Sequence, residues 1–290
     1  MTKYVTPVLR YPGGKSRALS LIIPRFPDKI EEYREPFIGG GSVFVRAKQL
    51  LGNDISYSIN DLNPDLILFW RELQTNSEEL IEFIREMKQR FATGRELYRY
   101  CLESAYSMNN FEKAARFFIM NRITFSGLID SGGYSQESYE KRFTESVINK
   151  MYPLSELLQG VKITLGDYTP HLSSPGENVF IFLDPPYLIA RKSELYGYKG
   201  DLHKIFNHLQ FAKCLEKCKH QWLMTCEDSP DMRNLFSYSK TMIKWDLNYG
   251  MTNSNKNGHT KRGNELLIGN YAMDINEKYP FSTRRVRRQV

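Results

Sequence analysis

The run Val179-Phe180-Ile181-Phe182-Leu183 is followed at once by Asp184-Pro185-Pro186-Tyr187. Five consecutive apolar residues of β-branched and aromatic character are typical of a strand that is buried on both faces, as in a parallel sheet covered by helices. Two consecutive prolines fix the backbone φ angle and offer no N–H, so the strand should end in a stiff turn. Ligands bind at the carboxyl ends of the strands in an open α/β sheet. This stretch therefore predicts both the fold class and the place of the site.

Helices and strands alternate on both sides of this stretch, which predicts an α/β protein with a parallel, Rossmann-like sheet. Near the N-terminus, a glycine loop leads from a short strand into a helix that starts at Ser42. The expected helices are residues 14–26, 42–51 and 202–219, and the expected strands are residues 33–36, a strand ending at 61, and 161–165, 179–183, 221–225, 241–247 and 265–270.

The middle of the chain carries no strand signal. From residue 64 to about 118, apolar residues such as Leu80, Ile84 and Met87 recur at helical spacing. Residues 124–142 are rich in Gly, Ser and Tyr and are expected to form a long loop. We therefore predict a discontinuous catalytic domain and an inserted helical domain, followed by a basic tail set apart from the fold. The catalytic domain comprises residues 1–68 and 160–275, the helical insertion residues 69–159, and the tail residues 276–290.

The 290 residues include 40 Lys and Arg against 33 Asp and Glu, which gives a formal charge of +7. This excess of basic residues favours a phosphate-rich partner. Part of the positive charge lies in the tail, at Arg284, Arg285, Arg287 and Arg288. No apolar run approaches the roughly 20 residues that a membrane span needs, and the N-terminus lacks a secretory apolar stretch. We expect a cytoplasmic protein without a membrane partner.

Four cysteines are present, and none forms a Cys-x-x-Cys pair. Cys214 and Cys218 lie one helical turn apart, and a zinc site that uses them with His220 has too few ligands at the wrong spacing. Reduced, packed thiols are the preferred interpretation. We predict no metal.

Asp184, Pro185 and Tyr187 suit chemistry on an aromatic amine. The nitrogen lone pair of such an amine is delocalised into the ring, so a catalyst must hold the N–H groups where the lone pair is localised. The Asp184 carboxylate and the Pro185 carbonyl can accept the two amino hydrogens, and Tyr187 can stack on an extruded base. An activated sulfonium methyl donor would leave alignment and charge placement to the protein. The alternative is an ordinary turn at the end of a strand.

The segment Glu35-Pro36-Phe37-Ile38-Gly39-Gly40-Gly41-Ser42 lies between a predicted strand and a predicted helix. Glycines there let the backbone approach a ligand at a helix N-terminus. A nicotinamide-binding pattern needs a small residue where Phe44 stands, so that class is disfavoured. About twenty residues on, Asp61 closes the next strand and can accept hydrogen bonds from ribose hydroxyls. The segment Asp61-Leu62-Asn63-Pro64 can also cap the following helix through its Asp or its Asn, which is a compatible second role.

A glycine turn also precedes Lys15, in Arg10-Tyr11-Pro12-Gly13-Gly14-Lys15-Ser16. A phosphate-binding loop would need an earlier glycine where Leu9 stands, which argues against an ATPase. Lys15 can instead pair with a carboxylate of the site, and Tyr11 can stack on a cofactor or a base. A solvated lysine after a turn is the alternative.

Together these motifs resemble the DNA adenine methylase family, the alpha group of N6-adenine DNA methyltransferases. The resemblance covers about residues 5–70 and 110–270. In family order, it is carried by Tyr11 to Lys15, Glu35 to Ser42, Asn60-Asp61, Asn121-Arg122 with Ser126-Gly127-Leu128, and Asp184 to Tyr187. It implies a Rossmann-like S-adenosylmethionine-dependent methyltransferase sheet with an inserted helical target recognition domain. The implied reaction is methylation of N6 of an adenine flipped out of double-stranded DNA.

The resemblance also implies roles for individual residues. Asp184 would lie between the cofactor and the target base, with Pro185 and Tyr187 beside it. The residues implied to contact S-adenosylmethionine are Tyr11, Lys15, Asp61 and Asp184, with Phe37 and Gly39 at its methionine end and Asp167 near its adenine.

DNA recognition is implied for the helical insertion. Residues 121–128 are similar to the family's Asn-Arg-x-x-x-Asn-Gly-Leu signature, except that Ser126 replaces an asparagine, which leaves the target sequence open. Arg122 is a candidate for a phosphate or guanine contact, with a buried structural arginine paired with a carboxylate as the alternative. Arg10 and Ser126 are further candidates. Asn253 and Lys261 lie in a polar, basic segment expected to be a hairpin tip, which either grips the DNA backbone or is simply exposed.

Two rivals to adenine methylation stay open. N4-cytosine methylation could use the same acceptor pair, and a DNA-binding homologue could have lost catalysis, although Asp184 and Lys15 argue against the second. A restriction endonuclease that cuts the same site is a candidate partner, and an orphan or phage enzyme is the alternative. We expect a monomer or a weak dimer.

Overall fold

The computed structural model describes residues 4–11, 13–129, 132–187, 206–248 and 262–279. A seven-stranded sheet in the order β3-β2-β1-β4-β5-β7-β6 forms its centre. The first five strands in this order are parallel, and β7 is antiparallel to both β5 and β6. The strands are β1 (Glu32–Glu35), β2 (Ser56–Asp61), β3 (Val161–Leu165), β4 (Val179–Leu183), β5 (Gln221–Glu227), β6 (Thr241–Asn248) and β7 (Arg262–Gly269).

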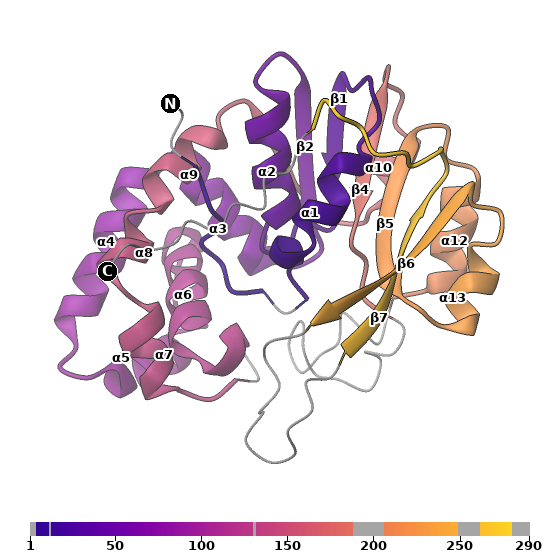
Figure 1. Ribbon diagram of the computed structural model, residues 1–290. Helices are drawn as coiled ribbons and strands as arrows, with labels where there is room; N and C mark the ends of the chain where they lie inside the picture. Colours follow the sequence, from indigo (N-terminus) through magenta and orange to yellow (C-terminus); the bar gives the residue numbers. More distant parts are fainter. Residues whose placement is uncertain (1–3, 12, 130–131, 188–205, 249–261, 280–290) are drawn as a thin grey trace, which may run out of the picture.

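Helices cover both faces of the sheet (Figure 1). The alternation of side chains along β4 shows why: Phe180 and Phe182 belong to one core cluster, whereas Ile181 and Leu183 belong to the other. The first cluster packs under α1 (Leu19–Ile22) and α2 (Ser42–Leu51), and the second under α10 (Thr169–Ser173), α12 (His208–Glu216) and α13 (Pro230–Leu235). The central strand is thus buried on both sides, as its unbroken apolar run predicts.

The single helix expected over residues 14–26 is wrong in detail. Three short pieces replace it: the 3₁₀ helix η1 (Lys15–Arg17), α1, and the 3₁₀ helix η2 (Ile23–Arg25). Pro24 lies in the first turn of η2, where its missing N–H and its ring oppose continuation of α1. The helix expected from Ser42 to Leu51 is confirmed as α2, and Gly41 precedes it with a φ of 70°.

A run of helices separates β2 from β3, as the sequence predicts. It comprises α3 (Pro64–Thr75), α4 (Ser77–Arg90), α5 (Gly94–Glu103), α6 (Asn110–Ile123), the 3₁₀ helix η3 (Phe125–Gly127), α7 (Gln136–Arg142), α8 (Glu145–Ile148) and α9 (Met151–Leu157). The long loop expected at residues 124–142 is therefore only partly right, because α7 occupies its second half. The Ser135 side chain accepts a hydrogen bond from Ser138 N and caps α7, so a serine that suggested a loop starts a helix instead.

The strand order reverses between β1 and β4, which lie side by side at the centre of the sheet. Such a switch point leaves a crevice at the carboxyl ends of the two strands, because the chain leaves them in opposite directions. Glu35 ends β1 and Asp184 follows β4, so both face this crevice region. The two motifs of highest interest are brought to one edge of the sheet.

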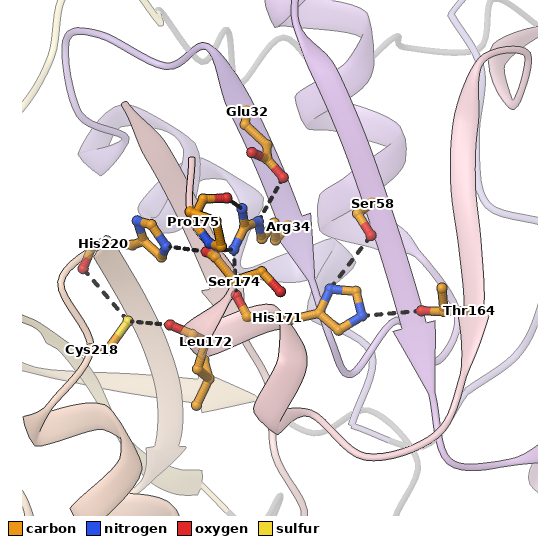
Figure 2. Close-up of polar contacts among 10 residues, drawn as sticks. All are labelled: Glu32, Arg34, Ser58, Thr164, His171, Leu172, Ser174, Pro175, Cys218 and His220. Carbon is orange, nitrogen blue, oxygen red and sulfur yellow. Dashed lines mark hydrogen bonds and ion pairs between the residues drawn. The ribbon is translucent and has the colours of Figure 1, made fainter. Parts of the chain in front are cut away.

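On the face covered by α10, a cluster of polar side chains holds this helix against the sheet (Figure 2). The Arg34 guanidinium donates to the carbonyls of His171 at 2.9 Å, Ser174 at 2.9 Å and Pro175 at 3.0 Å, and its Nε bonds Glu32 at 2.6 Å. It thereby satisfies carbonyls at the end of α10 that no helical N–H can reach.

His171 itself lies between two hydroxyl groups, with Nε2 3.0 Å from Thr164 Oγ1 and Nδ1 3.5 Å from Ser58 Oγ (Figure 2). We call Glu32, Arg34, Ser58, Thr164, His171 and the bonded carbonyls of α10 and the loop after it the α10 network.

The chain after β7 returns to the N-terminal helices. Tyr271 OH donates to Arg25 O at 2.7 Å, Asn276 N donates to Pro24 O at 2.6 Å, and Tyr279 is buried against Phe26. Residues 276–279 thus pack on the fold, which moves the start of the predicted tail; residues 280–290 lie outside the described residues. Within the described segments, no helix is long and apolar enough to cross a membrane.

Candidate functional site

Asp184 is held by an ion pair and a hydrogen bond directly after β4. Lys15 Nζ lies 2.7 Å from its Oδ1 and 2.9 Å from its Oδ2, and Thr225 Oγ1 donates to Oδ1 at 2.8 Å. Lys15 is almost fully buried, whereas the Asp184 side chain keeps 22% of its surface exposed. The carboxylate is therefore held by Lys15 at the start of η1 and by Thr225 in β5, and it keeps part of its surface open to a ligand.

Lys15 reaches this position because the chain turns at Gly13, which has a φ of 73°. Its Nζ donates to Gly13 O at 2.7 Å, which closes the turn on itself. The same ammonium lies 5.0 Å from the centre of the Tyr187 ring, within the range of a cation–π interaction. The sequence prediction that Lys15 pairs with a carboxylate describes the observed contact, and the solvated alternative is wrong.

The turn from Asp184 to Tyr187 has further supports. His208 Nε2 donates to Pro186 O at 2.8 Å from the start of α12. Tyr187 OH donates to Glu265 Oε2 at 3.1 Å, on β7. Together with the bonds to Asp184, these contacts fix the turn through groups from several elements. We call Lys15, Asp184, Tyr187, Thr225 and Glu265 the Asp184 site.

Buried carboxyl groups gather around this site. Glu265 is 1% exposed and lies directly opposite Glu227, which is 5% exposed, on the paired strands β7 and β5. Burial raises the pKa of Glu265 to about 7, and the nearby Asp184 and Glu227 charges add to the rise while Lys15 opposes it. Glu35 is also buried; burial raises its pKa well above the usual range, and a hydrogen bond from Tyr33 opposes the rise. These two buried carboxyl groups therefore hold a proton more readily than exposed ones do.

The glycine loop and Asp61 lie beside the site, at the ends of β1 and β2. Asp61 Oδ2 accepts from Gly39 N at 3.1 Å and its Oδ1 from Asn63 N at 3.0 Å; burial raises its pKa, and these N–H groups oppose the rise. Asn63, not Asp61, caps α3, since its side chain accepts from two backbone N–H groups there. Gly39 has a φ of 44°, and a Cβ on it would lie 3.0 Å from the Tyr11 ring. The loop and Tyr11 thus need a glycine at this contact.

The other candidates for cofactor contact lie further along the same edge. Phe37 packs in an aromatic cluster, with its ring centre 5.6 Å from that of Tyr168. Asp167 is exposed, and its Oδ1 accepts from Thr169 N at 2.7 Å at the start of α10. The structure thus brings Gly39 into contact with both Tyr11 and Asp61, while Asp167 follows Gly166, whose N donates to Asp61 O at 3.1 Å. Their cofactor roles remain predictions.

The candidates for DNA contact are placed differently. Arg122 is buried, its Nε donates to Arg142 O at 2.8 Å and its Nη1 to Val8 O at 2.9 Å, and burial and the neighbouring guanidinium groups lower its pKa to about 9. These are contacts of a structural arginine, although with carbonyls rather than the carboxylate considered above. Its DNA role stays a prediction.

Arg10 and Asn121 join the N-terminal segment to the helical insertion. Asn121 Oδ1 accepts from Arg10 N at 2.8 Å, and its Nδ2 donates to Arg10 O at 2.7 Å, while the Arg10 guanidinium donates to Ser138 Oγ at 3.2 Å and to a carbonyl. Ser126 is half-buried with a φ of 56°, a conformation that suits asparagine better than serine. Asn253 and Lys261 lie outside the described residues.

Sequence reasoning missed Thr225, His208 and Glu265. A threonine near a strand end and a glutamate in an apolar strand are not motifs, and they join the site only through the order of β4, β5 and β7 in the sheet. The one available signal is that Glu265 directly precedes the apolar run 266–268. Two residues of the zinc site that the sequence disfavours make other contacts. Cys218 Sγ donates to Leu172 O, and His220 Nε2 donates to Ser174 O.

Comparison with known proteins gives several similar sequences. A type II methyltransferase of Lactococcus lactis subsp. cremoris, M1.LlaDCHI, is 25% identical over 91% of this chain and 95% of its own length. The type II methyltransferase M.MjaIII of Methanocaldococcus jannaschii is 27% identical over 66% of this chain and 72% of its own. A DNA adenine methylase of Haemophilus influenzae is 25% identical over 81% and 84%.

A family model agrees with these relatives and with the geometry. It describes the D12 class of N6 adenine-specific DNA methyltransferases and matches residues 11–251, which include Lys15, the glycine loop, Asp61 and the Asp184 turn. With most of the chain matched, and with the motif residues gathered at one edge of a Rossmann-like sheet, the chain belongs to the D12 class of N6 adenine-specific DNA methyltransferases.

Proposed function

We propose that this chain transfers a methyl group from S-adenosylmethionine to N6 of an adenine that is turned out of double-stranded DNA. The observation that carries the proposal is the Asp184 carboxylate at the switch point of the sheet, fixed by Lys15 and Thr225 and still partly exposed. A carboxylate followed by a proline carbonyl offers two acceptors to one amino group. The family supports adenine as the base.

The residues beside Asp184 fit the proposed cofactor. Burial raises the pKa values of Glu265 and Glu35, and a positive sulfonium bound at this edge would favour their ionised forms. Asp61 accepts backbone N–H groups at both oxygens, and each carboxylate oxygen has a second lone pair for a ribose hydroxyl. When bound, the cofactor supplies an activated methyl group. Phe37, Tyr11, Gly39 and Asp167 are proposed to line its site.

The chain's own groups would then hold and deprotonate the amine. Asp184 accepts one N6 hydrogen and the Pro185 carbonyl the other, which favours a lone pair that points out of the base plane. Lys15 and Thr225 keep the carboxylate in place, so little reorganisation is needed as charge develops. As N6 bonds to the methyl carbon, the bond from that carbon to the sulfonium sulfur would break to leave a neutral thioether, and the nitrogen would release a proton to the Asp184 carboxylate. Tyr187 stacks on the base and keeps it in line with the methyl group.

DNA binding is proposed for the helical insertion, residues 69–159, together with the segment that contains Asn253 and Lys261. The net charge of +7 supports a polyanionic partner. Among the described candidates, Arg10 and Ser126 lie where the N-terminal segment meets the insertion, and Arg122 supports that junction from inside. We further propose a cytoplasmic enzyme that works with a restriction endonuclease for the same sequence, as a monomer or a weak dimer.

Product analysis tests the proposal. The purified protein is incubated with methyl-labelled S-adenosylmethionine and unmodified genomic DNA, the DNA is digested to nucleosides, and the nucleosides are identified by mass spectrometry. We expect labelled N6-methyl-2′-deoxyadenosine, and sequencing with modified-base detection then gives the target site. Labelled N4-methylcytosine alone would establish the cytosine rival. DNA binding without any labelled nucleoside would establish an inactive homologue.

A further inference from the structure

Glu265 is a buried acid in a strand that has no evident structural need for one. It precedes Leu266, Leu267 and Ile268, all fully buried, and it lies on the same sheet face as Leu267. An ionisable group in such a place is unfavourable unless other groups pair with it, so an apolar residue would serve the packing of β7 better. Its Oε1 is buried and accepts no hydrogen bond from the described residues.

The contact that Glu265 does make is with the aromatic ring proposed to receive the base. Tyr187 OH donates to Glu265 Oε2 at 3.1 Å, which holds the far end of the side chain. Lys15 Nζ lies 5.0 Å from the centre of the same ring. The ring is therefore restrained at its hydroxyl by Glu265 and at one face by Lys15, with the backbone fixed by the adjoining prolines.

Stacking depends on the orientation of a ring more than on its presence. A tyrosine can rotate about two side-chain bonds, and a base stacks in line for reaction in only one of the resulting positions. A hydrogen bond at the para oxygen is the contact that a rotated ring must break. This makes the acceptor on β7 a determinant of the stacking geometry.

We propose that Glu265 is a positioning residue that locks the Tyr187 ring as the stacking face for the extruded adenine. This inference rests on the proposed function. It links β7, which carries no family motif, to the Asp184 turn. The role requires an acceptor oxygen at this position and does not require a negative charge.

Four variants separate this role from a structural one. Glu265→Ala removes the acceptor, Glu265→Gln keeps it without the charge, and Tyr187→Phe removes the donor but keeps the ring. Leu267→Val, on the same face of the same strand, is the control for loosened packing. The probe is a duplex with 2-aminopurine at the target adenine, whose fluorescence rises when the base leaves the helix and is quenched when it stacks on an aromatic ring.

We expect Glu265→Ala and Tyr187→Phe each to lower kcat on the order of 10-fold, as a weakened base–ring contact would. Both should raise the 2-aminopurine emission of the complex, and the double variant should be no worse than either single one. Glu265→Gln should stay within about threefold of the parent. Leu267→Val should lower the melting temperature and leave the emission unchanged.

Three results would overturn the inference: an unchanged kcat and emission in Glu265→Ala, multiplied effects in the double variant, or a glutamine variant as impaired as the alanine one. These outcomes differ from failure of the proposed function. If the parent protein forms no N6-methyladenine, the function is wrong; if it does and Glu265→Ala equals it, only the positioning role is lost.

Discussion

Two buried polar clusters lie on opposite faces of the same sheet, and they are built differently. In the α10 network, Arg34 donates to three carbonyls and a carboxylate, and both ring nitrogens of His171 face hydroxyl groups. In the Asp184 site, a buried oxygen of Glu265 has no partner among the described residues, and the Asp184 carboxylate is still partly exposed. One cluster is complete in the protein alone, and the other is not.

The difference follows from what each cluster must do. A buried polar cluster with only a structural task is most stable when each donor and acceptor is paired, because an unpaired group loses its hydration without compensation. A site that must accept a ligand keeps groups whose partners arrive with that ligand. Substitutions in the α10 network should therefore affect the free energy of unfolding, and those in the Asp184 site should affect turnover.

The largest effect is expected for Asp184→Asn. The substitution keeps the size of the side chain but removes the charge that accepts the proton, so we expect kcat to fall by about 10³-fold. The free energy of unfolding should also fall, by ~1–3 kcal/mol, because the buried Lys15 ammonium loses its charged partner. Single-turnover methylation and urea unfolding measure the two quantities. Turnover within tenfold of the parent would contradict the role of the carboxylate.

Arg34→Met should show the reverse pattern. The methionine fills part of the space but leaves three carbonyls and Glu32 without their donor, which should lower the free energy of unfolding by ~3 kcal/mol or more. Turnover per folded molecule should stay near the parent value at a temperature where the variant is folded. Urea unfolding gives the first quantity and active-site-normalised kinetics the second. A variant of full stability would show that the network is not what holds α10.

The two clusters should also titrate with opposite sign between pH 5 and 7. Burial, with the nearby charges of Arg34 and Lys162 and against that of Glu32, lowers the pKa of His171 to about 4. The unfolded state then binds the proton first as the pH falls below 6.5, and up to ~3 kcal/mol of stability is lost toward pH 4. Glu265, with its pKa raised to about 7, binds its proton first in the folded state, so it reduces stability as the pH rises.

The free energy of unfolding of His171→Gln and of Glu265→Gln, measured between pH 5 and 7, separates the contributions of the two groups to the pH dependence of stability. We expect His171→Gln to remove an increase of stability with pH, and Glu265→Gln to remove a decrease. Equal slopes in the parent and both variants would show that neither group is shifted as the burial of its side chain implies.

Most of the fold could be predicted from the sequence, since the patterns that define it are local. The apolar run of β4, the glycine loop before α2 and the helical spacing between β2 and β3 each lie within a few residues. Short elements were harder: α10 and α13 span five and six residues and carry no full period of apolar positions. The sequence does not predict that the helix expected over residues 14–26 breaks at Pro24, because the residues around this proline follow a helical pattern.

Only those residues of the site that belong to short sequence motifs could be predicted. Asp184 and Lys15 were expected near each other, and they are, because each lies in a short signature of glycines or prolines. Thr225 and Glu265 come from strands whose neighbours are fixed by the sheet order, which the antiparallel insertion of β7 makes hard to foresee. The Arg122 side chain is oriented by the carbonyls of Val8 and Arg142. No local sequence pattern indicates these contacts, because both residues lie far from Arg122 along the chain.

The smallest expected effects come from one substitution made in both clusters, threonine to valine. Thr225→Val removes a hydrogen bond to Asp184 without changing the shape, so we expect kcat to fall about fivefold and the stability to change by less than ~0.5 kcal/mol. Thr164→Val removes the hydroxyl between His171 and Asn60, so we expect a loss of ~1–2 kcal/mol of stability with kcat unchanged. Because the chemical change is the same, any difference must come from the surroundings. If both variants lost stability and neither lost turnover, Thr225 would belong with the structural cluster, and the division between the two faces of the sheet would have to be redrawn.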